Sequence, residues 1–251
     1  MNNIRIIPRL DIKGPNLIKS IQFEGLKKLG DPADFAKKYY DEGADELLYM
    51  DIVASLYGRN NLLELIARAT KKIFIPLTVG GGIRSVEEAR KVFCSGADKI
   101  AINSAAVKNP KFISKLANKY GSQSIIVSIE AKKINNKWEA LIEHGRERTG
   151  LDVLSWAVRS EELGAGEILL TSVNKEGTGK GFEMELIKEI QKKIKIPLIV
   201  CGGMSDPKDI LELNNYEVSA VSMSSILHYN KFGIKQIKNC AKKNNLNVRP
   251  I

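Results

Sequence analysis

The 251-residue sequence has little cysteine and no long hydrophobic run, and each shortage excludes a class of protein. Its three cysteines lie far apart, with no CxxC pair and no nearby histidine, which argues against a disulfide framework or a zinc site. No apolar run approaches the roughly 18 residues that a membrane-spanning helix needs. The start of the chain has charges within its apolar stretch and is no signal peptide. We therefore expect a cytoplasmic protein that binds neither metal nor membrane.

Acidic residues are the minority among the charges. Lys and Arg number 39 against 29 Asp and Glu, a net charge of +10. A nucleic-acid-binding protein concentrates such an excess in one stripe. Here it is scattered in pairs, such as Lys27-Lys28 and Lys192-Lys193, mostly beside acidic residues. This pattern indicates solvated helix faces rather than a nucleic-acid surface, with an excess that can steer an anionic substrate.

Short β-branched runs alternate with amphipathic stretches along the whole chain. The predicted strands are Ile4–Leu10, Glu46–Ile52, Phe74–Val79, Lys99–Asn103, Ser124–Ile129, Glu167–Val173, Ile196–Cys201 and Val218–Met223. The predicted helices are Pro32–Asp41, Leu62–Lys72, Val86–Cys94, Pro110–Lys119, Val153–Leu163, Met184–Lys193, Pro207–Leu213 and Lys231–Lys243. Asp31, Asn109 and Asp206 each precede a proline as expected N-caps, and Ser85 to Glu88 resembles a capping box.

Eight strand–helix units predict an α/β protein with a closed (β/α)8 TIM barrel, in a single domain over residues 1–251. An open doubly wound sheet is the alternative, but no GxGxxG turn follows the first strand. An internal repeat supports the barrel, because Val79-Gly80-Gly81-Gly82-Ile83 recurs as Val200-Cys201-Gly202-Gly203-Met204. The sequence thus predicts two similar half-barrels, approximately residues 1–123 and 124–251.

Two connections are unusually long, and such loops tend to be functional. They run from Ile12 to Gly30 and from Ala131 to Gly150, where Trp138–Ile142 fits a small hairpin. Both follow the C-terminal ends of strands, where barrel enzymes place their active sites. The repeat predicts that they lie on opposite sides of the mouth.

Strand one ends in Asp11 and strand five ends in Glu130. In a duplicated barrel these carboxylates face each other across the mouth, which suits one as general acid and the other as general base. The alternative is that each caps a turn or pairs with Lys13 or Lys132.

Paired glycine and hydroxyl loops follow strands three, four, seven and eight. Gly82 and Gly203 belong to glycine-rich turns, and Asn103, Ser104 and Ser225 supply short donors nearby. Backbone N–H groups and helix N-termini of this kind bind phosphate. A tight turn is the alternative for one such loop, but two matching sets predict a substrate with a phosphate at each end.

Four charged residues open strands one, two, four and six: Arg5, Glu46, Lys99 and Glu167. They are expected to converge at the N-terminal face of the barrel. Two cations facing two anions form either a salt-bridged plug or a polar gate. In both interpretations the net charge of the four side chains must be zero.

The motifs RIIPRLDIK, LGDP, VGGGIRS, INSAAV, GSQS, ELGAGEILLTS and KEGT, with the final NVR, resemble the cyclase subunit of imidazole glycerol phosphate synthase, the HisF family of histidine biosynthesis. The resemblance covers essentially the whole chain. It implies a carbon–nitrogen lyase that needs no cofactor and works with a glutaminase (HisH-like) subunit, forming a heterodimer at the N-terminal face.

The resemblance also implies roles for individual residues. Ammonia from the glutaminase enters past Arg5, Glu46, Lys99 and Glu167 and crosses the barrel. Asp11 and Glu130 then act as acid and base on a bis-phosphorylated ribulosyl-formimino carboxamide nucleotide. The products are imidazole glycerol phosphate and an aminoimidazole carboxamide ribonucleotide. The matching substrate positions are Lys19, Gly82, Asn103, Ser104, Thr171, Gly177, Gly203 and Ser225.

The sequence departs from the family pattern at the mouth. Glu130 replaces an aspartate, Arg9 replaces a small residue, and Asn174 to Thr178 replaces D-R-D-G-T. By strand alternation Arg9 points into the barrel, where it needs a carboxylate partner. Among Glu130, Asp11 and Asp51 we expect Glu130, with its pKa depressed and its acid function weakened.

These departures leave two alternatives to the cyclase. One is a paralogue that delivers ammonia to a sugar amination or amidination step in surface polysaccharide synthesis. The other is a non-catalytic barrel that only binds and activates the glutaminase.

Overall fold

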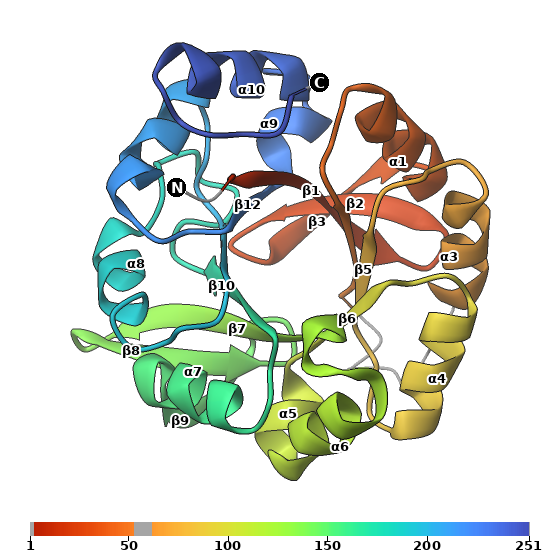
Figure 1. Cartoon of the computed structure of the whole chain (residues 1–251), viewed down its shortest axis with the longest axis vertical. Helices are drawn as coiled ribbons and strands as arrows, with labels where there is room; N and C mark the ends of the chain where they lie inside the picture. The colour runs from red at the N-terminus through yellow and green to blue at the C-terminus, as the bar shows by residue number, and fades with distance from the viewer. Residues whose placement is uncertain (1–2, 53–61, 251) are drawn as a thin grey trace.

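Eight parallel strands form a closed barrel in the computed structural model, which describes residues 3–52 and 62–250. The sheet closes because β12 pairs with β1 and β7 pairs with β10, so each barrel strand has a parallel neighbour on both sides (Figure 1). The barrel strands are β1 (Arg5–Lys13), β4 (Leu47–Asp51), β5 (Leu77–Gly80), β6 (Lys99–Ile102), β7 (Ile125–Ile134), β10 (Glu167–Ser172), β11 (Leu198–Cys201) and β12 (Ala220–Met223). The predicted barrel is confirmed.

Helices surround the barrel on its outer side (Figure 1). The longer ones are α1 (Pro32–Asp41), α3 (Leu62–Thr70), α4 (Val86–Cys94), α6 (Lys111–Tyr120), α7 (Val153–Glu162), α8 (Met184–Ile190) and α10 (Ile234–Lys243). Short helical segments are α5 (Ser104–Lys108), η1 (Ser122–Ser124), η2 (Pro207–Asn215) and α9 (Ser225–His228). Among the described residues, no helix has the length and apolar character needed to cross a membrane.

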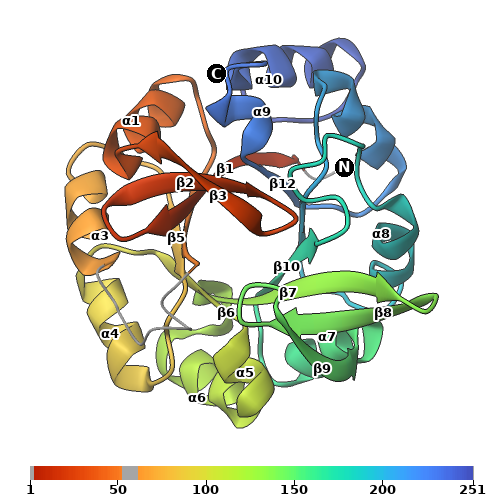
Figure 2. The same cartoon turned by 180° about the vertical axis from the view of Figure 1, so that it is seen from behind.

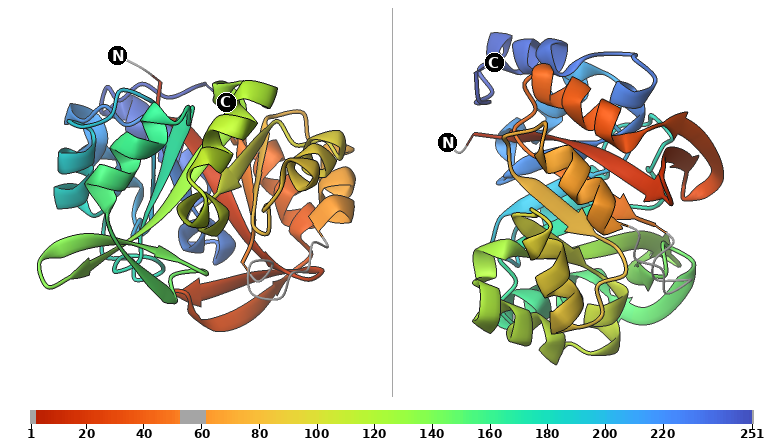
Figure 3. Two further views of the ribbon diagram at one scale, coloured as in Figure 1. Left: turned by 90° about the horizontal axis from the view of Figure 1, so that it is seen from below. Right: turned by 90° about the vertical axis from the view of Figure 1, so that its right-hand side faces the viewer.

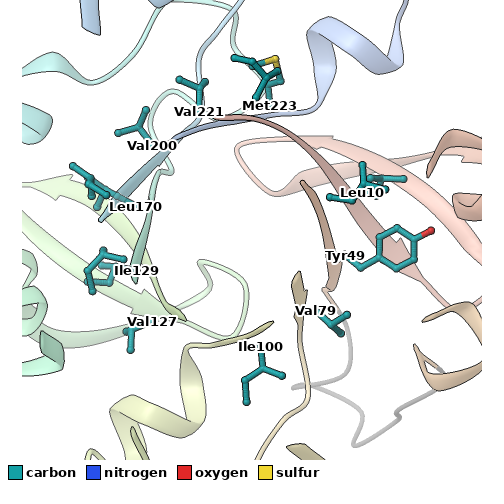
Figure 4. Close-up of a cluster of buried hydrophobic side chains, with 14 of the residues drawn as sticks. Leu10, Tyr49, Val79, Ile100, Val127, Ile129, Leu170, Val200, Val221 and Met223 are labelled. Carbon is teal, nitrogen blue, oxygen red and sulfur yellow. The ribbon is translucent and has the colours of Figure 1, made fainter. Parts of the chain in front are cut away.

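The strands bury both faces, so alternate side chains enter two different cores. On β1, Ile6 and Leu10 join the large apolar layer between strands and helices, and Ile7 joins a smaller cluster inside the barrel. Figure 4 shows Leu10, Val127 and others of the outer layer pointing away from the barrel axis. The inward positions of β1 are therefore Arg5, Ile7, Arg9 and Asp11, a line from one end of the barrel to the other.

Two antiparallel hairpins extend the sheet at one end of the barrel. The chain after β1 forms β2 (Asn16–Ile21) and β3 (Glu24–Gly30), where the sequence analysis placed a loop. After β7, β8 (Lys137–Ile142) and β9 (Glu147–Asp152) confirm and extend the hairpin expected at Trp138–Ile142. Figures 2 and 3 show both hairpins at the end of the barrel that lies opposite the N-terminus. We call this end the mouth.

Several predicted helices differ in detail. Residues 207–215 form a 3₁₀ helix instead of an α-helix, and the last helix begins at Ile234 after the separate turn α9. Asp31 and Asp206 cap their helices as predicted, but Asn109 does not. Pro110 itself is the N-cap residue of α6, so only the main-chain oxygen of Asn109 accepts a bond, from Phe112 N.

The capping box at Ser85 gives a local stability prediction. Ser85 Oγ accepts from Glu88 N, and the Glu88 side chain accepts from Ser85 N. We expect Ser85→Ala to lower the free energy of unfolding by about 1 kcal/mol, measured by urea denaturation. Ser95→Ala, at the other end of α4, is the control and should change stability by less than about 0.5 kcal/mol. Equal losses in the two variants would contradict the cap.

Candidate active site

Arg9 and Asp11 lie side by side on β1 inside the mouth, each about 1% exposed. Arg9 Nε donates to Asp11 Oδ1 at 2.8 Å, and Arg9 Nη1 donates to Thr171 Oγ1 at 3.1 Å. Arg9 thus points into the barrel as expected, but the prediction that it pairs with Glu130 is wrong. Arg9 and Asp11 are two residues apart on one strand, so their side chains point to the same face. Of the three candidate carboxylates, Asp11 is therefore the nearest along the strand to Arg9.

Glu130 is held from the other side of the mouth. Its Oε2 accepts from Gly145 N at 2.8 Å and from Asn103 Nδ2 at 3.1 Å. Burial raises the pKa of Glu130 to about 7, and the charge of Arg9 opposes this shift only in part. The expectation of a depressed pKa is therefore wrong, because loss of solvation outweighs a cation that is bonded elsewhere.

The two carboxyl groups of the mouth consequently differ in protonation. Burial would raise the pKa of Asp11, but the charges of Arg9 and Lys19 outweigh it and hold that pKa below its usual range. Asp11 is therefore a carboxylate at neutral pH, whereas Glu130 exchanges its proton near pH 7. Carboxyls whose pKa values are pushed apart are suited to act as base and acid.

Lys19 and Glu176 form a second buried ion pair in the mouth. Lys19 lies on β2 and bonds Glu176, which follows β10; both are about 2% exposed. Burial would lower the pKa of Lys19, but Glu176 and Asp11 outweigh it and raise that pKa. Lys19, one of the predicted substrate positions, is thus charged, and its partner Glu176 holds it in place on the first hairpin.

A cavity of about 540 Å³ opens on the side of β5 and β6. It brings together Gly82, Asn103 and Ser104 from the predicted phosphate loops with Glu130 and His144. The hydroxyl oxygen of Ser104 accepts from Glu143 N at 3.1 Å, which leaves its proton available for donation. This cavity can therefore hold an anion next to an acid of near-neutral pKa.

A smaller cavity of about 50 Å³ lies on the side of β11 and β12. It brings together Gly177, Gly203 and Ser225, the other predicted phosphate positions. Gly203 has a φ of +100°, and an added Cβ would lie 1.9 Å from the Gly181 carbonyl oxygen, so only glycine fits there. Thr171 lines neither cavity and is engaged by Arg9.

The four charges at the N-terminal ends of the strands form a closed ring. Arg5 Nη1 bonds Glu46 Oε1 at 2.5 Å, and Arg5 Nη2 bonds Glu167 Oε2 at 2.6 Å. Lys99 bonds both glutamates from the other side. The ring is neutral, since two cations face two anions, and it lies at the far end of the barrel from Asp11.

Sequence reasoning missed His144, Phe23 and the partner of Lys19. His144 and Phe23 are 6% and 4% exposed, and their rings lie 4.1 Å apart between the two hairpins. A lone histidine in a long loop gives no signal of burial, because the fold alone brings the loop tips together. Among the described residues, no cluster of three or more His, Cys, Asp or Glu is placed to hold a metal.

Comparison with known proteins identifies the class to which this barrel belongs. The model of a family described as histidine biosynthesis proteins matches residues 5–233. This match covers most of the chain, so the barrel is that of a histidine-biosynthesis protein.

Individual relatives narrow the class further. The imidazole glycerol phosphate synthase subunit HisF of Legionella pneumophila is 56% identical over 205 residues, 81% of this chain and 97% of that protein. The proteins of the same name from Methanocaldococcus jannaschii and Pyrococcus furiosus are each 44% identical, over 95% and 98% of this chain and 96% and 98% of their own lengths. The chain belongs to the HisF family.

Proposed function

We propose that this chain is the cyclase subunit of imidazole glycerol phosphate synthase, a lyase that uses ammonia to close an imidazole ring on a bis-phosphorylated carboxamide nucleotide. The observation that carries the proposal is the pair of carboxyl groups with opposite protonation, ionised Asp11 and proton-exchanging Glu130, in a mouth with two anion cavities. Asp11 acts as the base that takes a proton from the attacking nitrogen, and Glu130 as the acid that protonates the leaving group.

The substrate's two phosphates occupy the two cavities, one at Gly82, Asn103 and Ser104 and the other at Gly177, Gly203 and Ser225. Lys19 and Thr171 contact the part of the substrate between them, once it displaces their present partners Glu176 and Arg9. The test is turnover of the synthetic nucleotide with ammonium chloride, followed by the appearance of imidazole glycerol phosphate. No product at any pH between 6 and 9 would overturn the proposal.

The ammonia comes from a glutaminase subunit bound at the N-terminal face. The relatives are named as subunits of a synthase, and this face offers a hollow of about 520 Å³ lined by Lys99, Glu167, Phe93 and Tyr120. Phe74, on the loop before β5, is 81% exposed. An exposed apolar side chain two residues before Pro76, which lines the hollow, fits a protein partner that covers the charged ring.

The charged ring predicts a selective effect on glutamine-dependent turnover. Lys99→Met removes one cation, so Glu46 and Glu167 repel each other across a ring held only by Arg5. With the glutaminase subunit bound, we expect glutamine-dependent turnover to fall about tenfold, the size of a loss of roughly 1.4 kcal/mol. Turnover with added ammonia, which reaches the mouth from solvent, should stay unchanged in the same preparation. An equal fall in both assays would contradict a gating role.

The position of Arg9 favours a second candidate function, in which the barrel delivers ammonia to a different acceptor such as a sugar. Its guanidinium engages both Asp11 and Thr171 in the barrel interior, along the proposed ammonia route. Expression in a bacterium that lacks its own cyclase subunit separates the candidates. Growth without histidine supports the cyclase, and growth only with Arg9→Cys would support the second candidate.

A further inference from the structure

We propose that His144 is a further catalytic residue of this mouth, a neutral imidazole that carries the proton of Glu130 to and from the reacting group in the larger cavity. The inference deepens the proposed function and rests on it. His144 lines that cavity together with Glu130, and its Nδ1 lies 3.9 Å from Glu130 Oε1. Catalytic hydrogen bonds are often this long before substrate binds and shorten in the complex.

The other ring nitrogen of His144 is placed for a ligand. Nε2 is buried and has no hydrogen-bond partner among the described residues. A buried polar atom without a partner costs about 1–3 kcal/mol, and a ligand that bonds Nε2 would remove this cost. Since Nε2 and Nδ1 lie on opposite sides of the ring, the imidazole extends Glu130 toward a group that the carboxyl does not reach.

The backbone at His144 carries a second cost. Glu143 and His144 have φ values of +52° and +59°, the left-handed conformation that disfavours side chains with a Cβ. The turn at the other end of β8, which joins it to β7, has the same conformation but uses Asn135 and Asn136, residues that tolerate it. Apart from asparagines, the other non-glycine residues with positive φ among the described residues are Gln22 and Phe23, at the tip of the first hairpin that packs against His144. The costly backbone strain is thus confined to the two turns that meet at the mouth, which points to a function for the residues held there.

Neighbouring groups keep the imidazole neutral and in place. The Phe23 ring packs against it from the first hairpin, with the two ring planes tilted by 40°. Gly145 N, next in the chain, donates to Glu130. Burial lowers the pKa of His144 to about 4; Asp11 raises it, while the cations of Arg9, Arg146 and Lys19 lower it further. An uncharged ring at neutral pH can donate from one nitrogen while it accepts at the other.

The proton balance of the step is simple. The O–H bond of Glu130 breaks as an N–H bond forms at Nδ1, and the N–H bond at Nε2 breaks as a bond to the leaving group forms. The imidazole ends as the other tautomer with no net charge, and Glu130 ends as a carboxylate. Uptake of one proton from solvent at Nε2, while the Nδ1 proton passes back to the Glu130 carboxylate, resets both groups.

Chemical rescue tests the relay. His144→Gly suits the left-handed backbone and leaves an imidazole-sized space beside Phe23, so the variant should fold. We expect kcat with ammonia to fall about 100-fold in this variant. Added imidazole should then raise the kcat of the variant about tenfold. N-methylimidazole fills the same space but cannot pass a proton, and it should restore nothing. Asn136→Gly, the matched change at the opposite turn, should leave kcat unchanged.

Rescue by both compounds, or unchanged kcat in His144→Gly, would overturn the relay. If the unmodified protein makes no product, the proposed function fails and the relay is decided by spectroscopy. The chain has only two histidines, so ¹⁵N-histidine labelling gives ring signals from two imidazoles, each with two nitrogens, and His144→Asn identifies which pair belongs to His144. We expect the proton of His144 to move from Nε2 to Nδ1 as pH rises through about 7, where Glu130 ionises, and Glu130→Gln to abolish the change. A tautomer that stays constant from pH 5.5 to 8.5 would refute the coupling.

Discussion

Replacing Asp11 with alanine is expected to stop ring closure and to lower the free energy of unfolding by about 3–5 kcal/mol. Asp11 is the carboxylate that Arg9 Nε bonds at 2.8 Å, and both side chains are almost fully buried. Without Asp11 the guanidinium remains inside the barrel, and among the described residues its side-chain hydrogen bonds are left only to Thr171 and Cys201. Urea denaturation measures the stability loss, and the ammonia-dependent assay measures the loss of turnover, expected to be about 10³-fold.

A double variant separates the two roles of Asp11. Arg9→Met with Asp11→Leu replaces the buried pair by apolar side chains, which often preserves stability. We expect this variant to unfold at nearly the same urea concentration as the unmodified protein and to remain inactive. An Asp11→Ala variant as stable as the unmodified protein would show that Arg9 finds another partner.

Glu130→Gln is expected to lower turnover by about 10²–10⁴-fold while making the protein more stable at high pH. The amide keeps an oxygen that accepts from Gly145 N and Asn103 but has no proton to transfer. Because burial raises the folded-state pKa of Glu130 from 4.5 to about 7, ionised Glu130 destabilises the native state. This cost is absent below pH 4.5, grows between pH 4.5 and 7, and is complete above pH 7.

The stability difference should therefore depend on pH. At pH 8 the variant is expected to be more stable than the unmodified protein by about 3 kcal/mol, and at pH 4.5 the difference should vanish. Urea denaturation at the two pH values measures it. Equal differences at both pH values would mean that Glu130 is not buried as an acid with a raised pKa. Turnover limited by the acid form of Glu130 should likewise decline as pH rises above 7.

Much of the fold could be predicted from the sequence because its signals are local. Buried strands have continuous β-branched runs, and the helices have amphipathic periods and caps such as Asp31 and Ser85. The first hairpin was missed, because β3 is largely exposed and lacks an alternating pattern. Asn109 was wrongly expected to cap α6, because a one-residue shift in the start of a helix changes which group meets the free N–H groups.

For the candidate site, too, some features could be predicted from the sequence and others could not. Chain order alone, once eight strands form a barrel, places Asp11 and Glu130 at the mouth and the charged residues Arg5, Glu46, Lys99 and Glu167 at the other end. The same order groups the glycine and serine loops into two sets, since the ends of neighbouring parallel strands are adjacent. Those positions follow from connectivity and strand alternation, which a sequence contains.

Partners and proton affinities were decided only by the tertiary structure. Arg9 had three carboxylates within reach by sequence, and the direction of its side chain selected Asp11. Glu130 was expected to be more acidic and proves less acidic, because its pKa depends on how completely the surrounding loops exclude water. His144 reaches the mouth because two hairpin tips, separate in the sequence, pack ring against ring. Each outcome depends on distance and local dielectric, which long-range packing sets and no local pattern encodes.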